Sequence, residues 1–109
     1  MCAAVQNKFW PMHEALFAQQ GKWAPVKDPL PVLESIASST GLRMPEWKQC
    51  MSQHSTLALI QADHDRGTRS GAGSTPTFFV GSQTLAGADA DVKGAIEAAL
   101  AKAGSKPAP

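Results

Sequence analysis

The sequence predicts an α/β protein of the α+β type, in which four or five helices come before a β-hairpin and a closing helix. Apolar residues recur at helical spacing through most of residues 1–70. Two short strand patterns and a last helical pattern follow over residues 74–103. We therefore expect one domain over residues 1–103, mainly helical over 1–70 and strand–strand–helix over 74–103, with a flexible tail over 104–109.

The opening helical segment covers residues 2–20, where apolar residues recur at steps of four, three and four: Val5, Phe9, Met12 and Leu16. Residues at this spacing share one face of a helix. Proline lacks a backbone N–H and clashes with the preceding turn, so Pro11 is tolerated only near a helix start or at a kink. We expect a short first helix, a break capped by Asn7, and a second helix that ends at Gly21 in the left-handed conformation.

Residues 22–31 hold three prolines and no helical period, which predicts a connector. We expect Trp23 to fold back from it onto the core. Three helices follow with these expected limits: from residue 32 to Thr40-Gly41, from Pro45 to about residue 51, and from a cap at Ser55 to about residue 67. Aromatic residues at helical spacing are most often core, so one set is assigned to packing: Phe9, Trp10, Phe17, Trp23 and Trp47.

Strand patterns appear only in the last third of the chain. Thr77–Val80 is rich in β-branched and aromatic residues, and two residues, Gly81 and Ser82, separate it from the strand pattern of residues 83–86. This spacing predicts a tight β-hairpin. Asp89 or Asp91 is the expected cap of the last helix, which has one apolar side: Val92, Ala95, Ile96, Ala99 and Leu100.

The composition is that of an ordinary globular protein. The 109 residues are 43% hydrophobic and 17% charged, with a formal charge of +1. The charge shows no basic excess, so we expect no nucleic-acid partner. No apolar run is long enough to cross a bilayer, and no signal-peptide pattern follows Met1. We expect no membrane association and a cytoplasmic location, or a periplasmic one if a leader or an N-terminal half was removed.

The most specific stretch is Ser-Thr-Pro-Thr-Phe-Phe-Val-Gly at residues 74–81. Proline is excluded from the middle of a central strand but can stand before one, so Pro76 fits the start of Thr77–Val80. Its peptide bond is either a trans bond that simply begins the strand or a cis bond, which is uncommon and shapes a loop. The residues of this stretch leave both possibilities open.

Several features occur in an order that resembles the later part of DsbA-like, thioredoxin-fold thiol–disulfide oxidoreductases. They are the segment Lys-Phe-Trp-Pro-Met-His-Glu-Ala-Leu-Phe at residues 8–17, the helix ending near residue 67, the Thr-Pro-Thr-Phe-Phe-Val-Gly hairpin and the final helix. The resemblance covers nearly the whole chain. It implies a truncated thioredoxin-like fold, in which the chain starts inside the helical insertion and lacks the opening strand, the Cys-x-x-Cys helix and the second strand.

For the site, the resemblance implies that Ser74, Thr75 and Pro76 form a substrate-binding loop with a cis bond before Pro76. The catalytic cysteines of the family have no counterpart in this chain. Thiol–disulfide exchange requires a reactive thiolate and a nearby resolving thiol, which those cysteines would supply. We therefore assign no catalytic residue and expect the chain to be inactive alone, while its resemblance to a family of enzymes leaves open whether it is an enzyme.

Cys2 and Cys50 are the only cysteines, and they are too far apart in the sequence to form a Cys-x-x-Cys pair. One interpretation is that both cysteines are buried, reduced thiols. The other follows from the resemblance: proteins of that family sometimes join these regions by a structural disulfide. A zinc site built from Cys50 and His54 with other histidines has no paired ligand spacing, so we expect no metal and no cofactor.

A strand that loses one neighbour exposes unpaired N–H and C=O groups. Without the opening strand, the strand Thr77, Phe78, Phe79, Val80 would have such an edge. We expect two copies to pair there antiparallel, giving a two-fold homodimer with a four-stranded sheet.

The resulting function hypothesis is a catalytically silent, dimeric thioredoxin-like protein that binds a peptide or protein through its hairpin edge or its Thr75-Pro76 loop. The alternative is a component of a thiol–disulfide oxidoreductase whose Cys-x-x-Cys half is supplied by another chain or was truncated. A small-ligand binder is a third class, without support from particular residues.

Overall fold

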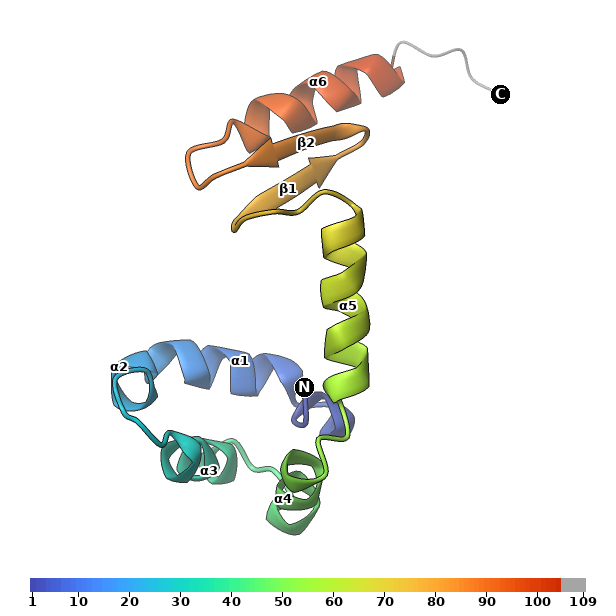
Figure 1. Cartoon of the computed structure of the whole chain (residues 1–109). Coiled ribbons are helices and arrows are strands. Elements are labelled where there is room, and N and C mark those ends of the chain that lie inside the picture. Colours follow the sequence, from blue (N-terminus) through green and yellow to red (C-terminus); the bar gives the residue numbers. More distant parts are fainter. Residues whose placement is uncertain (105–109) are drawn as a thin grey trace. The chain divides into compact units, whose positions relative to one another are not determined.

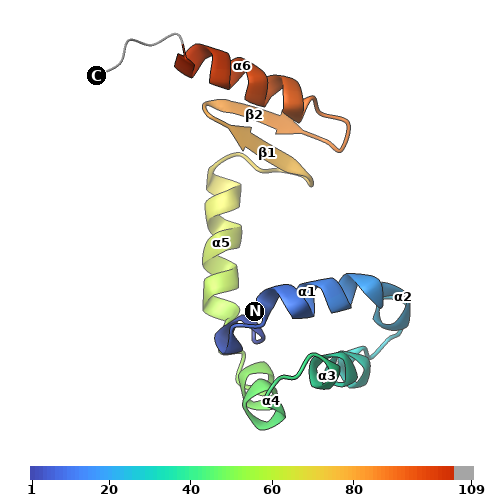
Figure 2. The ribbon, with the colours of Figure 1, turned by 180° about the vertical axis from the view of Figure 1, so that it is seen from behind.

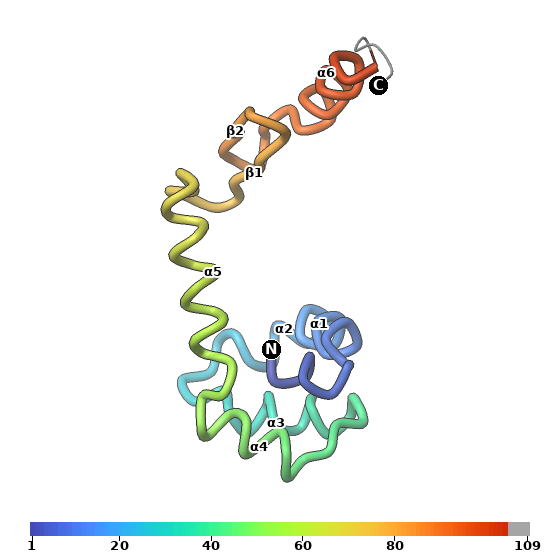
Figure 3. The backbone as a smooth tube through the Cα atoms, turned by 90° about the vertical axis from the view of Figure 1, so that its right-hand side faces the viewer, coloured from blue at the N-terminus to red at the C-terminus, as the bar shows by residue number. Residues whose placement is uncertain are grey.

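The computed structural model describes residues 1–104 and divides into two compact units, Met1–Ile60 and Gln61–Pro109 (Figure 1). Unit 1 contains a short 3₁₀ helix and four α-helices: η1 (Ala4–Gln6), α1 (Phe9–Ala18), α2 (Gln20–Trp23), α3 (Leu30–Ser39) and α4 (Met44–Ser52). The helix α5 (Leu57–Arg69), labelled on the backbone trace in Figure 3, contains the boundary between the two units. Unit 2 continues with β1 (Thr77–Val80), β2 (Gln83–Ala86) and α6 (Val92–Gly104).

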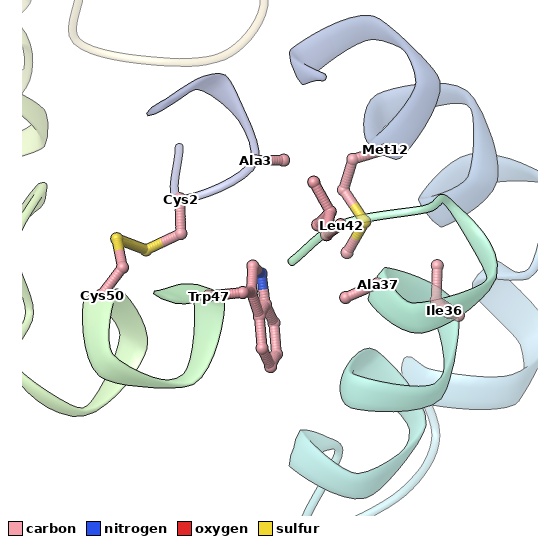
Figure 4. Packing of buried hydrophobic residues seen from close by; sticks show 8 residues of the cluster. All are labelled: Cys2, Ala3, Met12, Ile36, Ala37, Leu42, Trp47 and Cys50. Carbon is pink, nitrogen blue, oxygen red and sulfur yellow. A yellow bond between two sulfur atoms is a disulfide. The ribbon is translucent and has the colours of Figure 1, made fainter. Parts of the chain in front are cut away.

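Unit 1 has a small apolar core in which the first residues of the chain meet α1, α3 and α4 (Figure 4). Its buried members are Cys2, Ala3, Met12, Ile36, Ala37, Leu42, Trp47 and Cys50. Trp23 packs against this core from α2, and its indole Nε1 donates a hydrogen bond to the carbonyl of Leu16 at 2.8 Å. The prediction that Trp23 folds back onto the core is therefore confirmed.

The break before α1 is where predicted, but its cause differs. Asn7 does not cap α1: it has a φ of 59° and closes η1, with its N–H donating to the carbonyl of Ala4 at 3.0 Å. Asparagine is one of the few residues that adopt this left-handed conformation readily. α1 begins at Phe9, so Pro11 lies in its first turn, where its missing N–H costs no helical bond.

Two other expected helix ends are wrong by a few residues. Gly21 does not stop α1 but lies inside α2, while Gln19 separates the two helices. The cap of α5 is at Thr56 rather than Ser55, because the N–H of Ile60 bonds to the carbonyl of Thr56 at 3.1 Å. By contrast, Gly41 has a φ of 84° just after α3, so this helix ends as predicted.

Unit 2 is a two-residue-turn hairpin with a helix packed on β1. The strands pair antiparallel in this register: Thr77 with Ala86, Phe78 with Leu85, Phe79 with Thr84, and Val80 with Gln83. α6 lies along the hairpin in Figures 1 and 2. Of the two caps expected for α6, Asp91 is the one used: its Oδ1 accepts a hydrogen bond from the N–H of Gly94 at 2.9 Å.

The two faces of the hairpin differ in burial. Phe78 and its partner Leu85 are half-buried, whereas Phe79 is 49% exposed and its partner Thr84 is exposed. Successive side chains of a strand point to opposite faces, so α6 covers the face of Phe78 and the face of Phe79 is open. In the described part of unit 2, Ala95 is the one buried hydrophobic residue.

The expected tail began at residue 104, but Gly104 is the last residue of α6. Residues 105–109 lie outside the described residues. Within residues 1–104, no helix combines the length and the apolar character that crossing a membrane would require.

Candidate functional site

The loop Ser74, Thr75, Pro76 is exposed and leads directly into β1. The peptide bond between Thr75 and Pro76 is cis. Two hydrogen bonds hold the loop against the hairpin: the Thr77 hydroxyl donates to the carbonyl of Ser74, and the N–H of Gly87 donates to the carbonyl of Pro76 at 2.9 Å. The loop is therefore fixed to the start of β1.

A pocket lies beside this loop, entirely within unit 2, with a volume of about 310 Å³. The last turns of α5 and the segment that follows them line it: Asp63, His64, Gly67, Thr68, Ala72, Gly73, Ser74 and Thr75. Two of the predicted loop residues, Ser74 and Thr75, are thus pocket residues, while the contribution of α5 was not predicted. No sequence motif joins Asp63 to Thr75, because their proximity depends on how the chain turns after α5.

The lining of the pocket includes several side chains that can accept hydrogen bonds. Asp63 is the one carboxylate in its lining, and no lysine or arginine lines it. Arg66, next to the pocket on α5, donates through Nη2 to Asp63 Oδ1. The Thr68 hydroxyl donates to the carbonyl of His64 at 3.1 Å. The lone pairs of the hydroxyl oxygen can still accept hydrogen bonds from other donors.

β1 has a free edge. Among the described residues its one strand partner is β2. The carbonyl of Pro76 bonds to Gly87 on the β2 side, and backbone groups alternate along an antiparallel ladder, so the N–H and C=O groups of Thr77 and Phe79 point to the other side. These outward groups make up the free edge of β1, the strand Thr77, Phe78, Phe79, Val80 for which such an edge was predicted.

Cys2 and Cys50 are joined by a disulfide, with their Cα atoms 5.9 Å apart (Figure 4). The interpretation as two reduced thiols is therefore wrong, and the disulfide implied by the family resemblance is present. Cys50 is not available as a thiolate zinc ligand in this state. Within residues 1–104, no group of three or more His, Cys, Asp or Glu side chains could hold a metal ion.

Comparison of the chain with models of known families identifies its family. A family model described as thioredoxin matches residues 1–98. The chain belongs to the thioredoxin family. Comparison with curated proteins and with solved structures finds no match. The match includes residues of both units, and the predicted α+β fold is confirmed.

The aromatic residues of this thioredoxin-family domain are only partly core. Trp47 is buried and Trp23 is half-buried, as expected. Phe9, Trp10 and Phe17 are 37%, 66% and 64% exposed, so their assignment to packing is wrong. Met12 and Leu16 already fill the inner face of α1, which leaves the neighbouring aromatic rings outside it.

The exposed rings form a continuous stripe along α1. The ring centroids are 4.9 Å apart for Phe9 and Trp10, 5.2 Å for Trp10 and His13, and 4.9 Å for His13 and Phe17. The first two contacts are edge-to-face and the third is tilted. Aromatic pairs at such distances stabilise the structure beyond the area they bury. The stripe is a preformed apolar surface of unit 1.

Unit 1 contains another hollow, separate from the pocket of unit 2, and the sequence did not predict it. Its volume is about 540 Å³, and the side chains around it come from α3, α4 and the turn after α4: Leu30, Glu34, Trp47, Lys48, Met51, Ser52 and His54. Lys48 Nζ is 2.7 Å from Glu34 Oε1. The charged groups of this hollow satisfy each other, so it presents no unpaired charge to a ligand.

Proposed function

We propose that this thioredoxin-family domain binds an extended polypeptide along the free edge of β1, next to Ser74, Thr75 and Pro76, and catalyses no thiol–disulfide exchange by itself. The observation that carries the proposal is the outward direction of the backbone groups of Thr77 and Phe79. Added strands bind through such main-chain groups, and alternate side chains give them specificity.

The chemistry of the cysteines supports the second half of the proposal. Exchange begins with attack by a thiolate, and both sulfurs of this chain are bonded to each other. The cysteines are also buried, with 6% and 8% of their surfaces exposed. Neither residue resembles the accessible, activated thiol that such enzymes use.

The proposal includes self-association when no other polypeptide is bound. A second copy can place its own β1 against the same edge, with the two strands antiparallel about a two-fold axis. The combined sheet would have the strand order β2, β1, β1, β2. The homodimer and the peptide complex therefore compete for one edge.

Binding at this edge is tested by removing one outward N–H. The Phe79→Pro variant loses an edge donor but keeps the β1–β2 ladder, because the backbone groups of Phe79 point away from β2. We expect it to bind a fluorescent nine-residue peptide of alternating valine and threonine about tenfold more weakly than the unaltered chain, the loss of about 1 kcal/mol or slightly more per hydrogen bond. Fluorescence anisotropy measures the affinity.

Thr84→Pro is the matched control. Thr84 stands opposite Phe79, so its N–H points outward from the far edge of β2. The control should bind the peptide as the unaltered chain does, and circular dichroism should show that both variants keep their helices. Equal losses in the two proline variants, or no binding of the peptide to any of the three proteins, would refute binding at the β1 edge.

A second candidate function is a component of a thiol–disulfide oxidoreductase whose Cys-x-x-Cys part comes from another polypeptide. The open face of Phe79 favours it. In the proposed dimer, the two-fold axis that relates the antiparallel β1 strands is perpendicular to the joint sheet. Both α6 helices would therefore lie on the same face of that sheet. A second copy or a peptide thus completes the edge but brings no helix over the face of Phe79, where only side chains of the added strand can touch it. A strand followed by a helix covers both the edge and the face.

Insulin reduction distinguishes the two candidates. The chain alone, with dithiothreitol as the electron donor, should reduce insulin no faster than dithiothreitol does. Activity that appears only after adding a strand–helix–strand polypeptide with a Cys-x-x-Cys would establish the second candidate. Acceleration by the chain alone would contradict the proposal that it catalyses no exchange by itself.

A further inference from the structure

We infer that the pocket beside Thr75 receives a lysine or arginine side chain of the polypeptide bound along β1. The inference rests on the proposed function, because it names the class of polypeptide that the same site selects. The pocket adjoins the binding edge: Ser74 and Thr75 line it, and β1 begins two residues after Thr75. A strand that extends along β1 beyond Thr77 passes this loop.

The size of the pocket suits one long side chain. Its volume of about 310 Å³ is at the lower limit of small-ligand pockets. Gly67 and Gly73 contribute walls without side chains. A Cβ on Gly67 would meet only the Cβ of Ala72, at 4.0 Å, and a Cβ on Gly73 would meet nothing within 4 Å.

The presence of Gly67 inside α5 has a cost in helix stability. Glycine in a helix interior is less favourable than alanine by about 1 kcal/mol. Packing does not require the glycine, since the space above it is open. Its effect on the structure is to keep the pocket wide between α5 and the loop.

The polar groups of the lining suit a cationic side chain. Asp63 supplies a carboxylate, Thr68, Ser74 and Thr75 supply hydroxyl oxygens, and the imidazole of His64 also lines the pocket. The pocket also lies at the C-terminal turns of α5, which ends at Arg69, and the end of a helix dipole there is negative. The apolar stem of a lysine or arginine can pack on Gly67 and Ala72 while its head group reaches these oxygens.

Arg66 limits the strength of this interaction. It already donates to Oδ1 of Asp63, and the Asp63 side chain is 55% exposed. An exposed ion pair contributes modestly, so one added cation should improve binding about fivefold. The pocket is therefore a selectivity site, and the backbone edge supplies most of the affinity.

A lysine scan tests the inference. In the alternating valine–threonine peptide, a single lysine is placed at each position in turn and compared with norleucine at the same position. We expect one position where lysine binds the unaltered chain about fivefold more tightly than norleucine. In Asp63→Asn, and in Gly67→Leu where a side chain fills the pocket, this preference should disappear.

Glu97→Gln is the matched control, because Glu97 is an exposed carboxylate of the same unit, on α6, and does not line the pocket. It should keep the preference for lysine. Gly67→Ala serves as the folding control, and its melting temperature should equal or exceed that of the unaltered chain. Two results would overturn this inference and leave the proposed function intact. Either the peptides bind but no position prefers lysine, or the preference for lysine survives in Asp63→Asn and Gly67→Leu. Failure of every peptide to bind overturns both.

Discussion

Reduction of the Cys2–Cys50 disulfide is expected to lower the free energy of unfolding of unit 1 by about 4 kcal/mol. The bond closes a loop between residues 48 positions apart, and in the chain-entropy model such a loop removes many conformations of the unfolded chain. Both cysteines belong to a core of only eight buried residues, so little other packing can compensate. Thermal melting followed by circular dichroism, with and without dithiothreitol, measures the effect.

For a unit of this size, a loss of about 4 kcal/mol corresponds to a fall in melting temperature of about 15–30 °C. The Cys2→Ala, Cys50→Ala double variant should melt near the reduced chain, and adding dithiothreitol to that variant should change nothing. A reduced chain that melts within a few degrees of the oxidised one would contradict a stabilising role for the disulfide.

Phe79→Lys is expected to weaken self-association about 100-fold. In the proposed dimer, the β1 strands of two copies lie side by side, and a lysine from each copy would stand on the same face of the joint sheet. Phe79 is half-exposed in the single chain, and in the dimer it would touch side chains of the paired β1 strand; losing these contacts removes about 1 kcal/mol of apolar burial per copy. Repulsion between nearby like charges on paired strands adds about 1 kcal/mol. Sedimentation velocity over a concentration series measures the dimer dissociation constant.

Thr84→Lys is the matched control for this prediction. Thr84 lies opposite Phe79 on the same face but on β2, one strand farther from the proposed dimer axis. It should leave the dissociation constant within about threefold of that of the unaltered chain, because the two introduced charges are then well separated and screened by salt. A chain that remains monomeric at all concentrations, or equal effects of the two lysines, would contradict dimerisation through β1.

Most of the secondary structure was predictable because local chemistry determines it. The hairpin follows from two short β-rich runs separated by two residues, and the start of α6 follows from Asp91. The errors at Asn7 and Gly21 have a shared cause. Both residue types serve at several helix positions, so their identity alone does not tell that Asn7 closes η1 or that Gly21 lies inside α2.

The candidate site was less predictable than the fold. The loop Ser74, Thr75, Pro76 could be named from its sequence, but the wall that α5 contributes through Asp63 and Gly67 has no motif. The exposed stripe on α1 was missed for another reason. Helical spacing shows that aromatic rings are close together, but it does not tell which of two adjacent apolar faces is turned to the core.

The central claim is that polypeptides bind along β1, and amide hydrogen exchange at single residues tests it most directly. The measurement uses the dilute chain with and without the valine–threonine peptide. We predict that the amides of Thr77 and Phe79 exchange fast in the free chain and become protected when the peptide binds, while the outward amide of Thr84 keeps its rate. Unchanged exchange at Thr77 and Phe79 at saturating peptide would contradict the claim.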